Sequence, residues 1–254
     1  MLNTILHGTE GAKPPLLIVH GLYGSGRNWG VIAKRLSDER QVIAVDQRNH
    51  GDSPWTERHG YEDMAGDLAE VIEAHGGKAD VLGHSMGGKA AMVLALTRPE
   101  LVNRLILADI APVAYDHSQI QYIEAMRAVD LDAVEKRSDA NDQLARHVPE
   151  PTLRSFFTQS LDIKEKRWKL NLDLLAEEMP KIIGFPEVEG RFDGPTLFLS
   201  GGESDYVTPE HRPRIKALFP ESRFAKIPGA GHWLHAEKPR EFEAAVRAYL
   251  AATD

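Results

Sequence analysis

A serine between small residues is the first feature of the sequence that could do chemistry. Residues 83–87 read Gly-His-Ser-Met-Gly, which is the pattern G-x-S-x-G centred on Ser85. A β-type run over 79–82 precedes the pattern, and an alanine-rich helical run over 89–98 follows it. In that context a sharp strand-to-helix turn lifts the serine side chain clear of a sheet, and the neighbours two residues away must be small. The context favours a nucleophilic Ser85 over a glycine-rich turn that merely ends a strand.

A serine hydroxyl is a weak nucleophile at neutral pH and needs a base within hydrogen-bond reach. Among the 11 histidines, His232 is the best candidate, because it lies in a glycine-bracketed loop after the last β-type run, 223–227. The chemistry predicted for this pair is acyl transfer. His232 takes the proton of Ser85 as the oxygen attacks a carbonyl carbon, and it later returns that proton to the leaving group.

Two aspartates compete for the role of the acid that orients His232. Asp109 ends the β-type run 104–108, and Asp205 lies in the turn after the run 196–199. Asp205 comes three residues after Gly202, but the short segment from Asp205 to Val207 leaves the aim of its carboxylate open. The strand end that carries Asp109 adjoins the expected position of the His232 loop. We therefore favour Asp109 and keep Asp205 as the alternative acid.

Acyl transfer also needs N–H donors for the negative oxygen of its intermediate, and losing one such donor costs about 3–4 kcal/mol. The loop 20–26 reads His-Gly-Leu-Tyr-Gly-Ser-Gly and follows the β-type run 16–19. Its glycines let the backbone turn toward the sheet edge. We expect the backbone N–H groups of Leu22 and Met86 to form this oxyanion hole, although an ordinary turn after a strand would have the same composition.

A second polar loop, 46–54, is rich in turn-forming residues and follows the β-type run 42–45. It contains Asp46 and Arg48, which are expected at the same edge of the sheet as Ser85. We predict that both residues brace loops through an ion pair or hydrogen bonds, and that neither takes part in the reaction.

These residues require elements that bring them to one edge of a sheet. Short apolar runs alternate with helical segments, which predicts an α/β fold with a mostly parallel, twisted sheet of about seven or eight strands. The expected strands lie near 2–6 (an antiparallel edge), 16–19, 42–45, 81–82, 105–108, 196–199 and 223–227. From 115 to 188 no β-type run is apparent, and the length is too great for a structureless connection. We predict a helical cap (lid) over 115–188, inserted after the sixth strand, and a core domain made of 1–114 and 189–254.

Several motifs together resemble the α/β-hydrolase superfamily across nearly the whole chain. They are the segments 20–22, 46–53, 83–88 and 229–233. More narrowly, 109–113 (Asp-Ile-Ala-Pro-Val) and 201–207 resemble the small YbfF-type esterases. The resemblance implies the α/β-hydrolase fold and a capped serine esterase or thioesterase that needs no cofactor and no metal. It implies an acyl ester or acyl thioester as the small-molecule substrate, and it puts the acid at Asp109.

Other functions fit the same residues. A cofactor-free perhydrolase and a C–C bond hydrolase keep the same Ser-His-Asp set, and a ligand sensor that retains the triad would turn over slowly. Dehalogenases and epoxide hydrolases of this fold use an aspartate as nucleophile, so Ser85 argues against both.

Composition excludes several other classes. The chain has 254 residues, a net charge of −8 and no cysteine, and its 30 basic residues are dispersed. We therefore expect no nucleic-acid partner, no disulfide and no thiolate metal site. Residues 1–10 lack the pattern of a secretory leader, and no apolar run approaches the ~18 residues of a membrane span. The expected protein is cytoplasmic and has no membrane partner, while its oligomeric state is left open.

Overall fold

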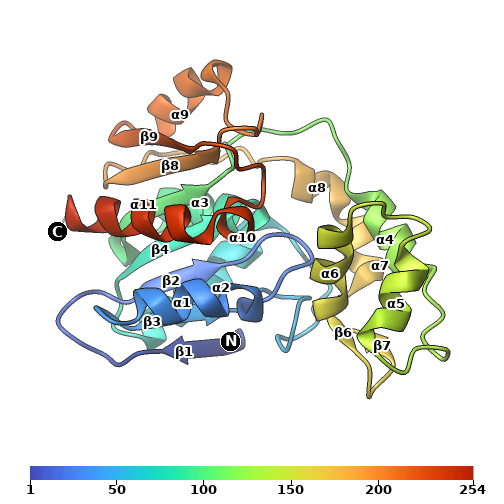
Figure 1. The fold of residues 1–254 in the computed structure, drawn as a ribbon. Helices are drawn as coiled ribbons and strands as arrows, with labels where there is room; N and C mark the ends of the chain where they lie inside the picture. The colour runs from blue at the N-terminus through green and yellow to red at the C-terminus, as the bar shows by residue number, and fades with distance from the viewer. Residues whose placement is uncertain (254) are drawn as a thin grey trace.

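A seven-stranded sheet forms the centre of the computed structural model, which describes residues 1–253 (Figure 1). The spatial order of its strands is β1-β3-β2-β4-β5-β8-β9. Only the edge strand β1 runs antiparallel to its neighbour β3, and the other neighbouring pairs are parallel. The strands are β1 (Thr4–His7), β2 (Leu16–Val19), β3 (Val42–Val45), β4 (Ala79–His84), β5 (Val102–Ala108), β8 (Thr196–Gly201) and β9 (Ser222–Ile227). The predicted α/β fold with a mostly parallel sheet is confirmed.

Helices cover both faces of the sheet because its central strands are apolar on both sides. Along β2, Leu16 and Ile18 face one apolar cluster, whereas Leu17 and Val19 face another. The first cluster is closed by α1 (Gly30–Leu36) and α11 (Pro239–Ala251), and the second by α2 (Tyr61–Ala74) and α3 (Met86–Thr97). The remaining helices outside residues 115–188 are α9 (Arg212–Leu218), α10 (Leu234–Glu237) and short 3₁₀ turns at Gly26–Trp29, Pro99–Leu101 and Pro209–His211.

The register between β4 and β5 sets the position of the candidate site. The last residues of these two parallel strands, His84 and Ala108, are directly paired. Ser85 and Asp109 are the next residues of the two strands, and each has a left-handed backbone with φ of 52°. The two side chains therefore leave the same carboxyl edge of the sheet side by side, where open parallel sheets hold their ligands.

Residues 115–188 form a group of short helices beyond that edge of the sheet (Figure 1). The elements are α4 (Ile120–Arg127), α5 (Arg137–Leu144), α6 (Pro151–Gln159), a small hairpin of β6 (Leu161–Asp162) and β7 (Arg167–Trp168), α7 (Leu172–Glu177) and α8 (Met179–Ile183). Their buried apolar residues, such as Ile123, Met126 and Phe157, belong to the same cluster as α2 and α3. The apolar interior of this segment is therefore continuous with that of the core.

Two details of the predicted architecture are wrong. The helical segment follows the fifth strand of the chain, β5, and not the sixth, because only β1 to β5 precede residue 115 within the described residues. The second error is the hairpin of β6 and β7, which lies inside a segment predicted to contain no strand. Strands of two residues are too short to leave an alternating pattern in the sequence.

Within residues 1–253, the helices are all too short or too polar to cross a membrane.

Candidate active site

Ser85, His232 and Asp109 form one chain of hydrogen bonds. His232 Nε2 lies 3.1 Å from Ser85 Oγ, and His232 Nδ1 lies 2.8 Å from Asp109 Oδ2. The three residues come from the turn after β4, the loop after β9 and the end of β5. Each ring nitrogen of the histidine therefore has its own partner, one hydroxyl and one carboxylate. This is the geometry in which a histidine accepts a proton from a serine while a carboxylate orients its ring.

The turn that carries Ser85 is possible only with small neighbours. Ser85 has φ of 52° and ψ of −121°, a sparsely populated region that costs about 1–3 kcal/mol. A Cβ atom on Gly87 would lie 2.4 Å from the carbonyl oxygens of Val19 and His20, and one on Gly83 would lie 2.5 Å from the Gly87 carbonyl oxygen. Strand β2 and helix α3 thus close on the serine from both sides.

Asp109 is fully buried, and both of its carboxylate oxygens accept hydrogen bonds. Oδ1 accepts from the Gly201 N–H at 3.0 Å, and Oδ2 accepts from Ser204 Oγ at 2.5 Å as well as contacting His232. Asp205 is exposed, and within residues 1–253 no hydrogen bond joins it to His232. Of the two aspartates considered for the acid, Asp109 is the one that the fold brings to the histidine.

The loop after β2 packs directly against the serine. A Cβ atom on Gly21 would lie 3.2 Å from Ser85 Cβ, so the backbone before Leu22 is as close to the nucleophile as a glycine allows. Among the described hydrogen bonds, none uses the Leu22 N–H. Met86 is the first residue of α3, a position whose N–H has no acceptor within its own helix. Both predicted oxyanion donors therefore lie next to Ser85, and their role stays a prediction.

A pocket of about 390 Å³ opens beside Ser85 and His232. Its lining combines the site with apolar side chains of the core and of the helical segment. From residues 115–188, the lining includes Tyr115, Tyr122, Phe156, Phe157, Ile182 and Ile183; from the core, it includes Tyr23, Ile110, Met86 and Trp233. The pocket is therefore suited to an apolar group whose reacting atom lies against the serine.

Comparisons with known proteins agree with this geometry. A family model described as "alpha/beta hydrolase fold" matches residues 14–239. The chain belongs to the α/β hydrolase fold family. It is 43% identical to a mouse protein named sn-1-specific diacylglycerol lipase ABHD11 over 253 residues, which cover 95% of this chain and 82% of the mouse protein. It is 38% identical to esterase YbfF of Escherichia coli K12 over 240 residues, which cover 93% and 92% of the two chains.

A solved structure titled "Marine microorganism esterase" superposes with a TM-score of 0.92 at 40% identity and 98% coverage of both chains. These similarities confirm the predicted resemblance to the α/β hydrolases and to YbfF, and the prediction that the chain is a hydrolase enzyme.

Two buried histidines join the loop after β2, which packs against Ser85, to the loop after β3. His50 Nε2 accepts from the Tyr23 N–H at 3.2 Å, and His20 Nε2 accepts from the Gln47 N–H at 2.9 Å. Because a backbone N–H can only donate, both rings carry their proton on Nδ1, where each donates to a carbonyl oxygen. Burial lowers the pKa of both histidines, that of His50 well below its usual value. The neutral rings act as fixed supports of the loop.

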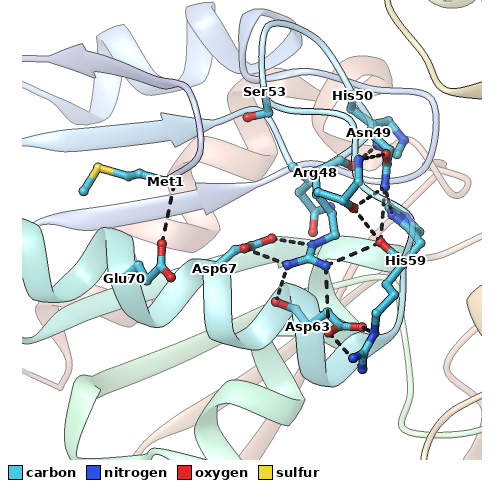
Figure 2. A network of polar contacts seen from close by, with 12 residues as sticks. Met1, Arg48, Asn49, His50, Ser53, His59, Asp63, Asp67 and Glu70 are labelled. Atoms are coloured by element: carbon cyan, nitrogen blue, oxygen red, sulfur yellow. Dashed lines mark hydrogen bonds and ion pairs between the residues drawn. The ribbon is translucent and has the colours of Figure 1, made fainter.

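Arg48 fastens the loop of His50 to helix α2 of the hydrolase (Figure 2). Its Nε and Nη2 donate to the two carboxylate oxygens of Asp67 at 2.6 and 2.8 Å, and its carbonyl oxygen accepts from His50 Nδ1 at 2.9 Å. Asp46 accepts from the N–H groups of Gly26 and Asp52 at 2.8 and 2.9 Å. Arg48 and Asp46 thus make the bracing contacts that the sequence predicts, with separate partners.

Sequence reasoning missed three side chains at the site of the hydrolase. Ser204 contacts Asp109, Tyr206 stacks on His232, and Lys89 lines the pocket from helix α3. Ser204 and Tyr206 flank Asp205, so the sequence identifies their loop as part of the site. It does not predict which side chains of the loop point toward Asp109 and His232. For Lys89 a signal was present, because a single cation stands in the otherwise uncharged run Met86–Thr97.

Among residues 1–253, no group of three His, Asp or Glu side chains is arranged to hold a metal ion.

Proposed function

We propose that this hydrolase is a serine esterase that cleaves acyl esters through a covalent acyl-enzyme. The hydrogen-bonded chain from Ser85 Oγ through His232 to Asp109, at the mouth of an apolar pocket, carries the proposal. The names of the mouse and E. coli relatives, a diacylglycerol lipase and an esterase, support the same substrate class. Acyl thioesters share the reacting carbonyl and fit the same chemistry.

In the first step, Ser85 Oγ attacks the carbonyl carbon of the ester while His232 Nε2 takes its proton. The carbonyl oxygen becomes an oxyanion, which the N–H groups of Leu22 and Met86 stabilise by hydrogen bonds. Asp109 accepts from Nδ1–H and stabilises the imidazolium as it forms. The imidazolium then protonates the leaving alcohol as the carbon–oxygen bond breaks, so the serine becomes an ester of the acyl group.

In the second step, water attacks the acyl-enzyme and His232 again acts as the base. The tetrahedral intermediate collapses to the free acid and returns the proton to Ser85 Oγ. The two steps use the same three side chains and the same two N–H groups. No other group of the chain needs to change its protonation state.

The helical segment 115–188 forms the cap of this proposed site and selects the acyl group. Tyr122, Phe156 and Phe157 from the segment line the pocket together with Ile110 and Trp233 of the core. Because burying apolar surface contributes about 25 cal/mol per Å², an acyl chain gains affinity with each methylene until the pocket is filled. A finite pocket of about 390 Å³ therefore predicts an optimum acyl length within a homologous series.

The proposal is tested with p-nitrophenyl esters of increasing acyl length. Wild-type protein is expected to hydrolyse the series with an optimum in kcat/KM. Ser85→Ala is expected to lose at least a thousandfold in kcat, because the nucleophile is lost and alanine still fits the turn. Ser222→Ala, which removes a buried serine hydroxyl at the start of β9 and outside the pocket lining, controls for a general effect of losing a hydroxyl. If Ser85→Ala kept more than about a thousandth of the wild-type rate, Ser85 would not be the nucleophile.

A further inference from the structure

The ring of Tyr206 lies flat against the imidazole of His232. Their centroids are 3.9 Å apart, and their planes differ by 19°. Ser85 and Asp109 contact the two nitrogen atoms at the edge of the imidazole, so neither covers its face. Tyr206 therefore contacts the base from a direction that the two hydrogen bonds do not use. The mechanism proposed above gives this residue no role.

Several hydrogen bonds fix the position of Tyr206. Its carbonyl oxygen accepts from the Tyr115 hydroxyl at 2.8 Å, and its N–H donates to Ser204 Oγ at 3.3 Å. A further hydrogen bond of 2.6 Å joins its phenol oxygen to His117 Nε2. Two of these partners, Tyr115 and His117, lie at the start of the helical segment. The ring is thus held by both the core and the segment that covers the pocket.

We propose that Tyr206 is a positioning residue that acts through His232, holding the imidazole in its reactive orientation and stabilising the imidazolium that forms during acyl transfer. A cation within about 6 Å of an aromatic face is attracted by the negative charge of that face. The stacked geometry brings the whole imidazolium within this distance. The effect on the reaction rests on the proposed esterase function, whereas the effect on the resting imidazole does not.

No other cation among the described residues around His232 opposes the attraction between the imidazolium and the Tyr206 ring. The side chains that face His232 or its flanking backbone from the packed elements are Ser85, Asp109, His84, His235, Trp233, Tyr206 and Glu237. Burial lowers the pKa of His84 well below its usual value and that of His235 to about 3, so both rings are neutral near pH 7. Burial also raises the pKa of Tyr206 to about 12, which keeps its phenol uncharged. Asp109 acts in the plane of the imidazole, and Tyr206 acts on its face.

The test compares Tyr206→Leu and Tyr206→Met with Tyr206→Phe. Leucine and methionine keep apolar cover over His232 but remove the aromatic face, whereas phenylalanine keeps the face and removes the hydroxyl. The protonation midpoint of His232 is measured in the resting protein by NMR of ¹⁵N-labelled imidazole, and in turnover from the pH dependence of kcat/KM. The Leu and Met variants are expected to move both midpoints to lower pH by about 0.5–1.5 units, because the imidazolium loses its aromatic contact. Their plateau kcat is expected to fall roughly 2- to 30-fold, and phenylalanine is expected to restore the midpoint.

Tyr249→Leu is the matched control, because it removes another buried phenol from the core, on helix α11. It is expected to lower the melting temperature without moving either midpoint. A purely structural role of Tyr206 would give the same result as this control. Folded Leu and Met variants with the wild-type NMR midpoint would overturn the inference. The NMR midpoint requires no turnover, so a failure of the inference is distinguished from a failure of the esterase function, which Ser85→Ala tests.

Discussion

Two residues of the site share an unusual positive φ angle. Ser85 and Asp109 both have φ of 52° directly after paired strand residues. Their N–H groups donate to the carbonyl oxygens of Ala108 and Leu199, at 3.2 and 2.9 Å. Each of these residues therefore makes a hydrogen bond to the neighbouring strand although its φ angle is strained. Such strain, about 1–3 kcal/mol per residue, persists only where the surrounding structure holds it. The same device presents both the candidate nucleophile and the candidate acid at the sheet edge.

The contacts of Asp109 lead to a prediction about the acid. Asp109→Asn is expected to lower kcat by about 10⁴-fold, because an amide no longer holds the imidazole in the working tautomer. Asp205→Asn is expected to lower kcat less than about tenfold, because the Asp205 carboxylate is exposed and makes no bond to His232. The measurement is steady-state kinetics on one p-nitrophenyl ester, with the fold checked by circular dichroism. The reverse ranking would move the acid to Asp205, and comparable modest losses would mean that the two carboxylates share the task.

At this scale the sequence predicts residues that belong to short local motifs. Ser85 is identified by its flanking glycines, and His232 by a glycine-bracketed loop after the last strand. Asp109 follows from its place at a strand end and from the family resemblance. Tyr206 was not predicted, because its stack on His232 joins two loops that are 26 residues apart in the chain and depends on a side-chain direction. No local pattern records such a direction.

At the scale of elements, Lys89 ties the helix after the nucleophile to the end of the helical segment. Its side chain is 1% exposed, and Nζ donates to the carbonyl oxygens of Ile183 and Gly184 at 2.9 and 2.5 Å. The Nζ atom also lies 4.7 Å from the centre of the Tyr115 ring. Within residues 1–253 no carboxylate forms an ion pair with Lys89. Burial lowers the pKa of Lys89 to about 7.

This pKa predicts how stability depends on pH. An unfolded chain protonates lysine up to a pH of about 10.4. Between about pH 7 and 9.5 the unfolded state therefore binds more protons than the folded state, and the free energy of unfolding rises with pH through this group. The expected slope approaches about 1.4 kcal/mol per pH unit in that window. Below pH 7 Lys89 is protonated in both the folded and the unfolded state, so burial of its charge lowers the free energy of unfolding by the full amount.

Lys89→Met removes the titrating group and is expected to lose this part of the slope. Urea unfolding of the wild type and of the variant at several pH values between 7 and 9.5 measures the difference. The exposed Lys34 on α1 provides the control, since Lys34→Met is expected to keep the wild-type slope. Above pH 9.5 buried tyrosines begin to contribute, because burial raises the pKa of Tyr61 and Tyr115. Parallel curves for the wild type and Lys89→Met would show that Lys89 is charged in the folded protein.

The elements themselves were predictable where one period dominates the sequence. The buried runs of β2 and β3 contain only apolar residues, and α2 places Met64, Leu68 and Ile72 on one face. The hairpin of β6 and β7 was missed, since each strand has two residues and its pairing depends on packing against the core. The sequence predicts that the segment 115–188 is helical. It does not predict which of its residues line the pocket, because that also depends on how the helices pack against the core.

At the scale of the whole molecule, the sheet edge, the loops after β2 and β9 and the helical segment meet around one pocket. The core closes the pocket from the side of Ser85, and the helical segment covers it with aromatic residues such as Phe157. The predicted hydrolase fold is confirmed, whereas the division into a core and a cap domain stays a prediction. A cytoplasmic location and the absence of nucleic-acid partners also stay predictions, because they concern the surroundings of the chain rather than its fold.

The covalent intermediate is the central claim, and trapping it is the most direct test. The protein is incubated with a p-nitrophenyl alkylphosphonate, whose phosphorus takes the place of the attacked carbonyl carbon, and the modified peptide is identified by mass spectrometry. One phosphonyl group per chain is expected on Ser85, with slower labelling in His232→Ala because the base is lost, and none in Ser85→Ala. A phosphonyl group on another residue, or full labelling of Ser85→Ala, would contradict the account.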